Sequence, residues 1–187
     1  MKTNKLKKLL AMLLAGVLAM LCLAACGKDD DDDDDDEDDA EPYVKVLDDY
    51  FKALNKCDGK LYVKTTYFDI AKEQAEDDLD EDYDSLEEYW TERLEDNKDY
   101  NEEEYGDNVK FSYEAKKAKE LSKDKLSDIQ ESLCDRYDAD SDEIKVTEGY
   151  EVKVKITTKG DDDEETDTEN CYIYKINRQW VLSPYFE

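Results

Sequence analysis

The chain has 187 residues, of which 54 are acidic and 26 are basic, so its formal net charge at pH 7 is −28. A chain this acidic repels nucleic acid, and we expect no nucleic-acid partner. The sequence contains no histidine. This excludes Ser–His–Asp and Cys–His catalysis within the chain, as well as zinc sites that use histidine.

Residues 1–25 have the pattern of a secretory signal peptide. The first eight residues, "MKTNKLKK", carry four lysines and no acid, and residues 9–25 carry no charge. A basic start followed by a short apolar run is typical of a secretory signal. The apolar run is slightly short for a comfortable membrane span.

The end of this segment resembles the lipobox of bacterial lipoproteins. It reads Leu23, Ala24, Ala25 and Cys26, followed by Gly27. The resemblance implies that the thiol of Cys26 receives a diacylglycerol, and that signal peptidase recognises the residues around it and cuts before Cys26. Two acyl chains hold a protein durably at a membrane. We therefore expect a lipid anchor at the outer face of the cytoplasmic membrane, facing the cell wall. The alternative is a plain signal peptide with a chance cysteine.

Residues 26–40 form a predicted linker between the lipidated cysteine and the folded part. Residues 29–39 are eleven consecutive acids, and such a block repels itself into an extended chain that buries nothing. Weak binding of divalent cations is the alternative reading. Flexible carboxylates bind calcium poorly, because ordering them costs conformational entropy.

Residues 41–187 are predicted to form one domain, and its first part reads as helical. Apolar residues recur at helical spacing over 41–57, with Pro42 in the first turn and a stop at Asp58–Gly59. The next helix covers 60–74 and is interrupted near Tyr67. An acidic loop over 76–84 precedes a helix that begins after Ser85 and fades near Asn97, and a loop over 101–108 follows.

The second part reads as strands with one helix inserted. Alternating apolar and polar residues predict strands over 109–121 and 143–160, on either side of a helix capped by Ser122. Gly149 would permit a bulge or bend. Residues 160–169 are predicted to be a long hairpin loop. Two last strands over 170–176 and 179–186 are joined tightly at Asn177–Arg178.

This order of elements predicts an α+β fold with helices on one face of an antiparallel sheet. Residues 106–185, and above all the closing segment "YIYKINRQWVL", resemble small Gram-positive lipoproteins with a nuclear transport factor 2-like domain. The resemblance implies a cone: a curved antiparallel sheet wrapped against N-terminal helices, often with an apolar cavity at its mouth. Members of this family range from enzymes to binding modules, so the fold leaves the function open.

The aromatic residues of the predicted strands are candidates to line that cavity. They are Tyr113, Tyr150, Tyr174 and Trp180, with Tyr172 close by in sequence. Rings of this kind, with carboxylates nearby, suit a sugar, although tyrosine on a sheet is more often a core residue with a wet hydroxyl.

No metal or cofactor is predicted. Asp138, Asp140 and Asp142 alternate as in a calcium loop, but Glu143 and Gly149 occupy positions where that loop needs Gly and Glu. The remaining cysteines of the folded part, Cys57, Cys134 and Cys171, match no zinc spacing. We expect three small buried hydrophobic residues, with one disulfide as the alternative.

Three functions remain open. The first is a non-enzymatic lipoprotein that binds a protein partner or small ligand outside the cell, with the lipid on Cys26 as its membrane contact. The second is a solute- or glycan-binding module that uses cavity aromatics. The third is a small enzyme with an Asp/Tyr proton-transfer pair. A carboxylate with a raised pKa in a cavity would favour the enzyme, and rings around an apolar cavity would favour the glycan module.

Overall fold

The computed structural model describes residues 41–183, so the signal peptide, the Cys26 lipobox and the acidic linker lie outside the described residues. Over the described range the chain has an α+β fold, with five helices and a curved antiparallel sheet of four strands in the order β1-β2-β3-β4. The predicted fold class is confirmed at this level.

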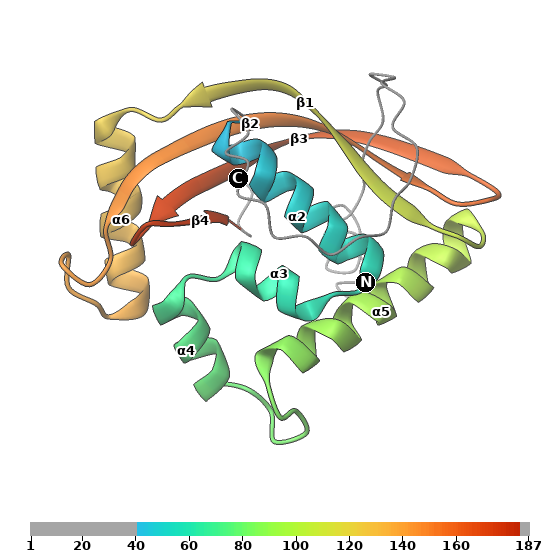
Figure 1. Ribbon diagram of the computed structural model, residues 1–187, viewed down its shortest axis with the longest axis horizontal. Helices are drawn as coiled ribbons and strands as arrows, with labels where there is room; N and C mark the ends of the chain where they lie inside the picture. Colours follow the sequence, from blue (N-terminus) through green and yellow to red (C-terminus); the bar gives the residue numbers. More distant parts are fainter. Residues whose placement is uncertain (1–40, 184–187) are drawn as a thin grey trace, which may run out of the picture.

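Four helices precede the first strand and a fifth lies between the first two strands (Figure 1). The helices are α2 (Pro42–Lys56), α3 (Gly59–Thr66), α4 (Asp69–Asp77), α5 (Leu86–Tyr105) and α6 (Lys123–Tyr137). The strands are β1 (Lys110–Glu120), β2 (Val146–Lys159), β3 (Glu164–Ile176) and β4 (Gln179–Leu182).

Helix α2 forms because its apolar residues repeat at helical spacing. Leu47, Phe51 and Leu54 are buried on one face against the sheet. The predicted stop at Asp58–Gly59 is displaced. Cys57 takes the left-handed conformation that ends α2, while the Asp58 side chain accepts a hydrogen bond from the Leu61 N–H and caps α3.

The interruption near Tyr67 is confirmed. Helix α3 ends at Thr66, Tyr67 is extended and α4 begins at Asp69. The Ser85 cap is confirmed as well, since its side chain accepts from the Glu88 N–H while the Glu88 carboxylate accepts from the Asp84 N–H.

Two predicted boundaries are wrong. Helix α5 does not fade near Asn97 but continues to Tyr105, because Asn101 is buried with its amide on the Asn97 carbonyl and Tyr105 is buried in the core. The predicted hairpin loop over 160–169 is mostly strand, since β3 begins at Glu164 and pairs with β2 from there.

Tertiary contacts stabilise this polar hairpin. The Tyr105 hydroxyl donates to Glu165, and Lys159 forms an ion pair with Glu164 across the turn at 2.5 Å. The tight turn at Asn177–Arg178 is confirmed, with both residues at positive φ (49° and 76°). The register shift in β2 falls between Val146 and Glu148, just before Gly149, and a second one interrupts β1 between Ala115 and Lys117.

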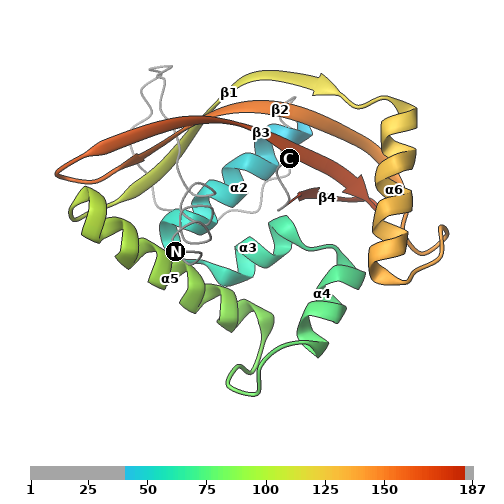
Figure 2. The same ribbon diagram turned by 180° about the vertical axis from the view of Figure 1, so that it is seen from behind.

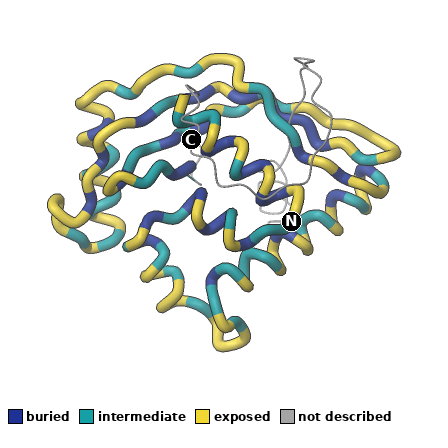
Figure 3. Tube along the Cα trace, in the orientation of Figure 1, coloured by how far each residue is buried: buried dark blue, intermediate teal, exposed yellow. Residues whose placement is uncertain are grey.

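The sheet has two different faces, which we call inner and outer. The inner face carries Val152, Val154 and Ile173 and is covered by α2 and α3 (Figure 1). The outer face lies on the opposite side of the strands. Helix α6 packs on it at one end (Figure 2), where Phe68 and Ala71 at the start of α4 join the same buried cluster. Buried residues accordingly line the helix faces that point to the sheet (Figure 3).

Candidate functional site

The candidate site is a groove between α6 and the outer face of β3. Ser122 caps α6 by accepting a hydrogen bond from the Lys125 N–H, and Asp138 in the left-handed conformation ends it. Leu126 buries one side of the helix in a core cluster with Ile144 and Val146. This packing leaves a neighbouring strip of α6 facing the sheet across the groove.

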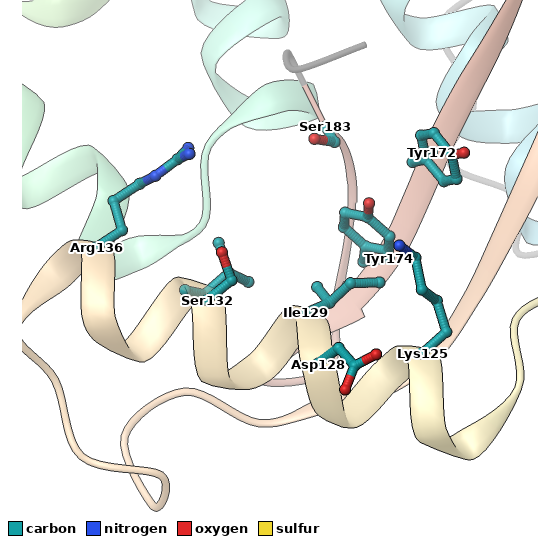
Figure 4. Close-up of a pocket in the computed structure, with 9 residues that line it drawn as sticks. Lys125, Asp128, Ile129, Ser132, Arg136, Tyr172, Tyr174 and Ser183 are labelled. Atoms are coloured by element: carbon teal, nitrogen blue, oxygen red, sulfur yellow. The ribbon is translucent and has the colours of Figure 1, made fainter. Parts of the chain in front are cut away.

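One part of the groove is a pocket of about 200 Å³. Figure 4 shows Lys125, Ile129 and Arg136 reaching into it from α6, and Tyr172 and Tyr174 from the sheet. Ser132 and Ser183 add hydroxyl groups on opposite sides. The lining therefore combines aromatic rings, one aliphatic wall and a polar rim, which is the composition of a binding surface.

The two tyrosines share the outer face because they are two residues apart on one strand. Their rings are nearly parallel, with centroids 6.4 Å apart and planes 23° apart, and both side chains are half-buried. Two aligned rings present a flat apolar platform that a ligand can cover without ordering a flexible side chain.

The groove continues beyond Tyr172 toward the start of α6. There a second hollow of about 500 Å³ is lined by Lys119, Leu121 and Glu151, and it shares Lys125 and Tyr172 with the first. A shallow, continuous groove of this kind suits an extended ligand better than an enclosed solute, because neither part closes around its contents.

The charge of the groove differs from that of the domain. Residues from 41 onward carry 43 acids against 21 bases, yet in the pocket between α6 and β3 Lys125 and Arg136 outnumber the one acid, Asp128. Along the continuation of the groove the excess disappears, because Glu120 and Glu151 offset Lys119. A local excess of positive charge in an acidic domain favours a ligand with anionic or strongly polar groups at this place.

The aromatic residues predicted to line a single cavity are divided between the two faces of the sheet. Tyr113, Tyr150 and Trp180 lie on the inner face, while Tyr174 lies on the outer face in the groove. Strand parity explains the division, since Tyr150 pairs with Ile173 and Tyr174 with Gly149.

Tyr113 is occupied by contacts within the domain. Its ring stacks on Phe51 at 4.9 Å, and its hydroxyl donates to Asp48 and to the Val44 carbonyl. Burial, and next the Asp48 carboxylate, raise the pKa of Tyr113 well above its ordinary value. Tyr113 therefore joins α2 to the sheet.

Tyr150 and Trp180 form a second aromatic group, at the start of α2. The Tyr150 ring lies 5.1 Å from Tyr43 and 5.7 Å from Trp180, and Lys175 lies over the Trp180 ring at 5.6 Å. The Tyr150 hydroxyl donates to Glu41 at 3.3 Å. These rings fix the beginning of the folded part against the sheet.

Another hollow, of about 470 Å³, lies among α3, α4 and β4. Hydrogen bonds join the elements of its wall, because the Gln179 amide donates to the carbonyls of Lys64 and Tyr67. Lys72 and Glu87 form an ion pair at 2.6 Å across it. Their mutual hydrogen bond raises the pKa of Lys72 and lowers that of Glu87. We interpret these polar groups as stabilising the fold rather than binding a ligand.

Within residues 41–183 no cluster of carboxylates and cysteines is arranged to hold a metal ion. Asp138, from the calcium-like pattern, is the residue that ends α6. The thiols of Cys57, Cys134 and Cys171 are free; Cys171 is buried, as expected, whereas Cys57 and Cys134 are only half-buried.

Sequence reasoning selected Tyr174 but missed Lys125 and Arg136. A helical projection from Ser122 could have placed these two residues and Ile129 on one side of α6, but not against β3. Comparison of the chain with family models, with curated proteins and with solved structures finds no match. Among the described helices, none is both long and apolar enough to cross a membrane.

Proposed function

We propose that this chain is a lipid-anchored extracytoplasmic lipoprotein whose folded part is a non-enzymatic binding domain of the nuclear transport factor 2-like class. The anchor is the lipid on Cys26, and the domain faces the cell wall at the outer face of the cytoplasmic membrane. The α6–β3 groove is its binding surface. The observation that carries the binding role is the pair of aligned tyrosines, Tyr172 and Tyr174, in a pocket that Lys125 and Arg136 also line.

The order of the elements supports the class proposed for the fold. Helices come first, a curved antiparallel sheet follows, and one helix is inserted between its first two strands. This is the arrangement that the resemblance implies for a cone. The inner side is filled by Leu47, Phe51 and Leu54 of α2, so the proposed binding surface is on the outer side.

The ligand that fits the groove best is an extended segment of a protein partner. The two parts of the groove, of about 200 and 500 Å³, are both open to solvent, whereas a small-molecule pocket buries most of its ligand. An extended chain could instead place one apolar side chain on the tyrosine platform and anionic groups near Lys125. A glycan is the second candidate, because tyrosine faces also stack on sugar rings.

Site-specific photo-crosslinking tests this function. A photoreactive side chain at Ser132, which lines the groove, is compared in intact cells with one at Ser127, which is exposed on α6 outside it. We expect one dominant adduct from position 132 only, and its loss when Tyr174→Ala is added. Tyr100→Ala, at an exposed tyrosine, serves as the matched control and should leave the adduct unchanged.

The mass and composition of the adduct separate peptide from glycan. Equal labelling from both positions, or an adduct that survives Tyr174→Ala, would exclude the groove as the binding surface.

A further inference from the structure

The outer face of the sheet, from the end of the groove at Lys119 onward, carries a group of lysines. Strand register places Lys117, Lys119, Lys153 and Lys155 together on this face, and we call these four residues the lysine face. Lys117, Lys119 and Lys153 are exposed, and Lys155 is half-buried. Helix α2 packs on the inner side of these strands, and α6 lies at the end of the sheet (Figure 2).

The arrangement of these lysines is unfavourable by itself. Lys117 lies directly opposite Lys153 in the β1–β2 ladder, and Lys155 follows Lys153 by two residues on the same face. Like charges directly opposite each other destabilise a sheet. Two carboxylates lie on the same face, Glu151 opposite Lys119 and Glu114 opposite Lys155. They offset the excess only in part, because they are two against four lysines and Glu114 pairs with Lys116. Within residues 41–183 none of the four lysines has an ion pair of its own.

An anionic segment of the same chain begins close to this face. Glu41 accepts a hydrogen bond from Tyr150, which pairs with Glu120 in the ladder, next to Lys119. Strand β1 is the edge of the sheet, so a chain that leaves Glu41 reaches the outer face by passing one strand. The eleven acids at 29–39 are separated from Glu41 by a single residue.

We propose that the acidic tract 29–39 docks on the lysine face of its own domain. The length is sufficient, because residues 29–40 span about 40 Å when extended and neighbouring strands are about 4.8 Å apart. Covalent attachment gives the tract an effective concentration of the order of millimolar at this surface, which an anionic polymer or lipid headgroup in trans must exceed.

The acidity of the rest of the domain does not prevent this docking. At physiological ionic strength charges are screened beyond about 8 Å, so the tract responds to the lysines next to it rather than to the net charge. Docking places carboxylates between Lys117 and Lys153 and removes their repulsion. The inference does not depend on the groove having a ligand.

Carbodiimide coupling tests the proposal on the full chain in isolated membranes. The reagent joins a neighbouring carboxylate and amine as an amide, and itself takes up the water released. Trypsin then yields the peptide 29–45, which contains the whole tract. We expect this peptide on the lysine face at roughly tenfold higher yield than on Lys52 and Lys56, which are exposed on α2 and nearer in sequence.

Salt and charge reversal provide the controls. Coupling of the tract to the lysine face should fall several-fold in 0.5 M NaCl. In the double variant Lys117→Glu/Lys153→Glu, coupling to the two remaining lysines, Lys119 and Lys155, should also fall several-fold. It should persist in Lys52→Glu/Lys56→Glu, which has the same net charge. Coupling between Lys159 and Glu164, an ion pair of the β2–β3 hairpin, reports that the sheet is intact in every variant.

Three outcomes would overturn the proposal. The first is equal coupling of peptide 29–45 to the α2 lysines. The second is coupling between chains, detected by mixing isotopically light and heavy protein. The third is a lysine face that is protected from the reagent without coupling to the tract, which would assign the face to a polymer or lipid headgroup instead.

Discussion

Asn55 on α2 bonds to both backbone polar groups of Phe111 on β1. Its side-chain oxygen accepts from the Phe111 N–H at 2.8 Å, and its amide donates to the Phe111 carbonyl and, at 2.8 Å, to the Phe51 carbonyl. Since β1 is an edge strand, these groups of Phe111 point away from β2. One side chain thus replaces the missing neighbouring strand.

Asn55→Ala should lower the free energy of unfolding by about 1–3 kcal/mol, because it leaves backbone groups of Phe111 unpaired in a partly buried place. Urea denaturation followed by tryptophan fluorescence measures this change. Asn170→Ala, at an exposed residue of the outer face, is the matched control and should change stability by less than about 0.5 kcal/mol. Equal effects of the two substitutions would show that the Asn55 bonds contribute little.

Stability should decline above about pH 9. Burial raises the pKa of the Cys171 thiol to about 12, and burial likewise raises the pKa of the Tyr50 and Tyr62 hydroxyls. Below the unfolded-state pKa values both states hold these protons, so the stabilisation is complete. As the pH rises, the unfolded chain loses protons that the folded chain retains, which favours unfolding until the folded-state pKa values are reached.

Tyr50→Phe should therefore reduce the loss of stability between pH 8 and pH 11, because it removes one titrating group from the core. Tyr100→Phe, at an exposed ring, should leave the pH dependence unchanged. The measurement is urea denaturation over this pH range. If the stability of Tyr50→Phe fell with pH as steeply as that of the parent protein, the hydroxyl of Tyr50 would not be a source of the pH dependence.

Gly59 marks a close approach of α3 to α5. A Cβ atom at this position would lie 2.0 Å from the Glu87 carbonyl oxygen, and the Gly59 N–H donates to the Thr91 hydroxyl. Gly59→Ala should therefore lower stability by about 1–3 kcal/mol, since the two helices must separate. Thermal unfolding measures this loss of stability, and Lys60→Ala, at the neighbouring exposed residue, is the control. An unchanged midpoint in Gly59→Ala would contradict the close packing.

Membrane association should depend on Cys26 alone among the cysteines of the N-terminal segment. Cys26→Ser removes the thiol that accepts the diacylglycerol, so the processed, lipid-modified form should be lost. Cys22→Ser lies within the apolar run and should leave lipidation intact. Mass spectrometry of the N-terminal peptide and membrane fractionation give the readout. A lipid-modified Cys26→Ser chain would rule out the proposed anchor.

The sequence by itself determined the element types and most of their boundaries in the folded part. Periodicity located α2, α6 and the strands, Ser85 and Ser122 marked helix starts, and Asn177–Arg178 marked the tight turn. These signals are local, because capping and strand alternation act over a few residues.

Only the tertiary structure decided where α5 ends and where β3 begins. The polar residues of these segments lack the apolar periodicity that locates an element, and distant contacts such as Tyr105 with Glu165 order them. Tertiary packing also separated Tyr174 from Tyr113, Tyr150 and Trp180, because the register of β3 against β2 assigns each ring to one face. The groove exists because α6 crosses the outer face, and that crossing depends on packing between residues far apart in sequence.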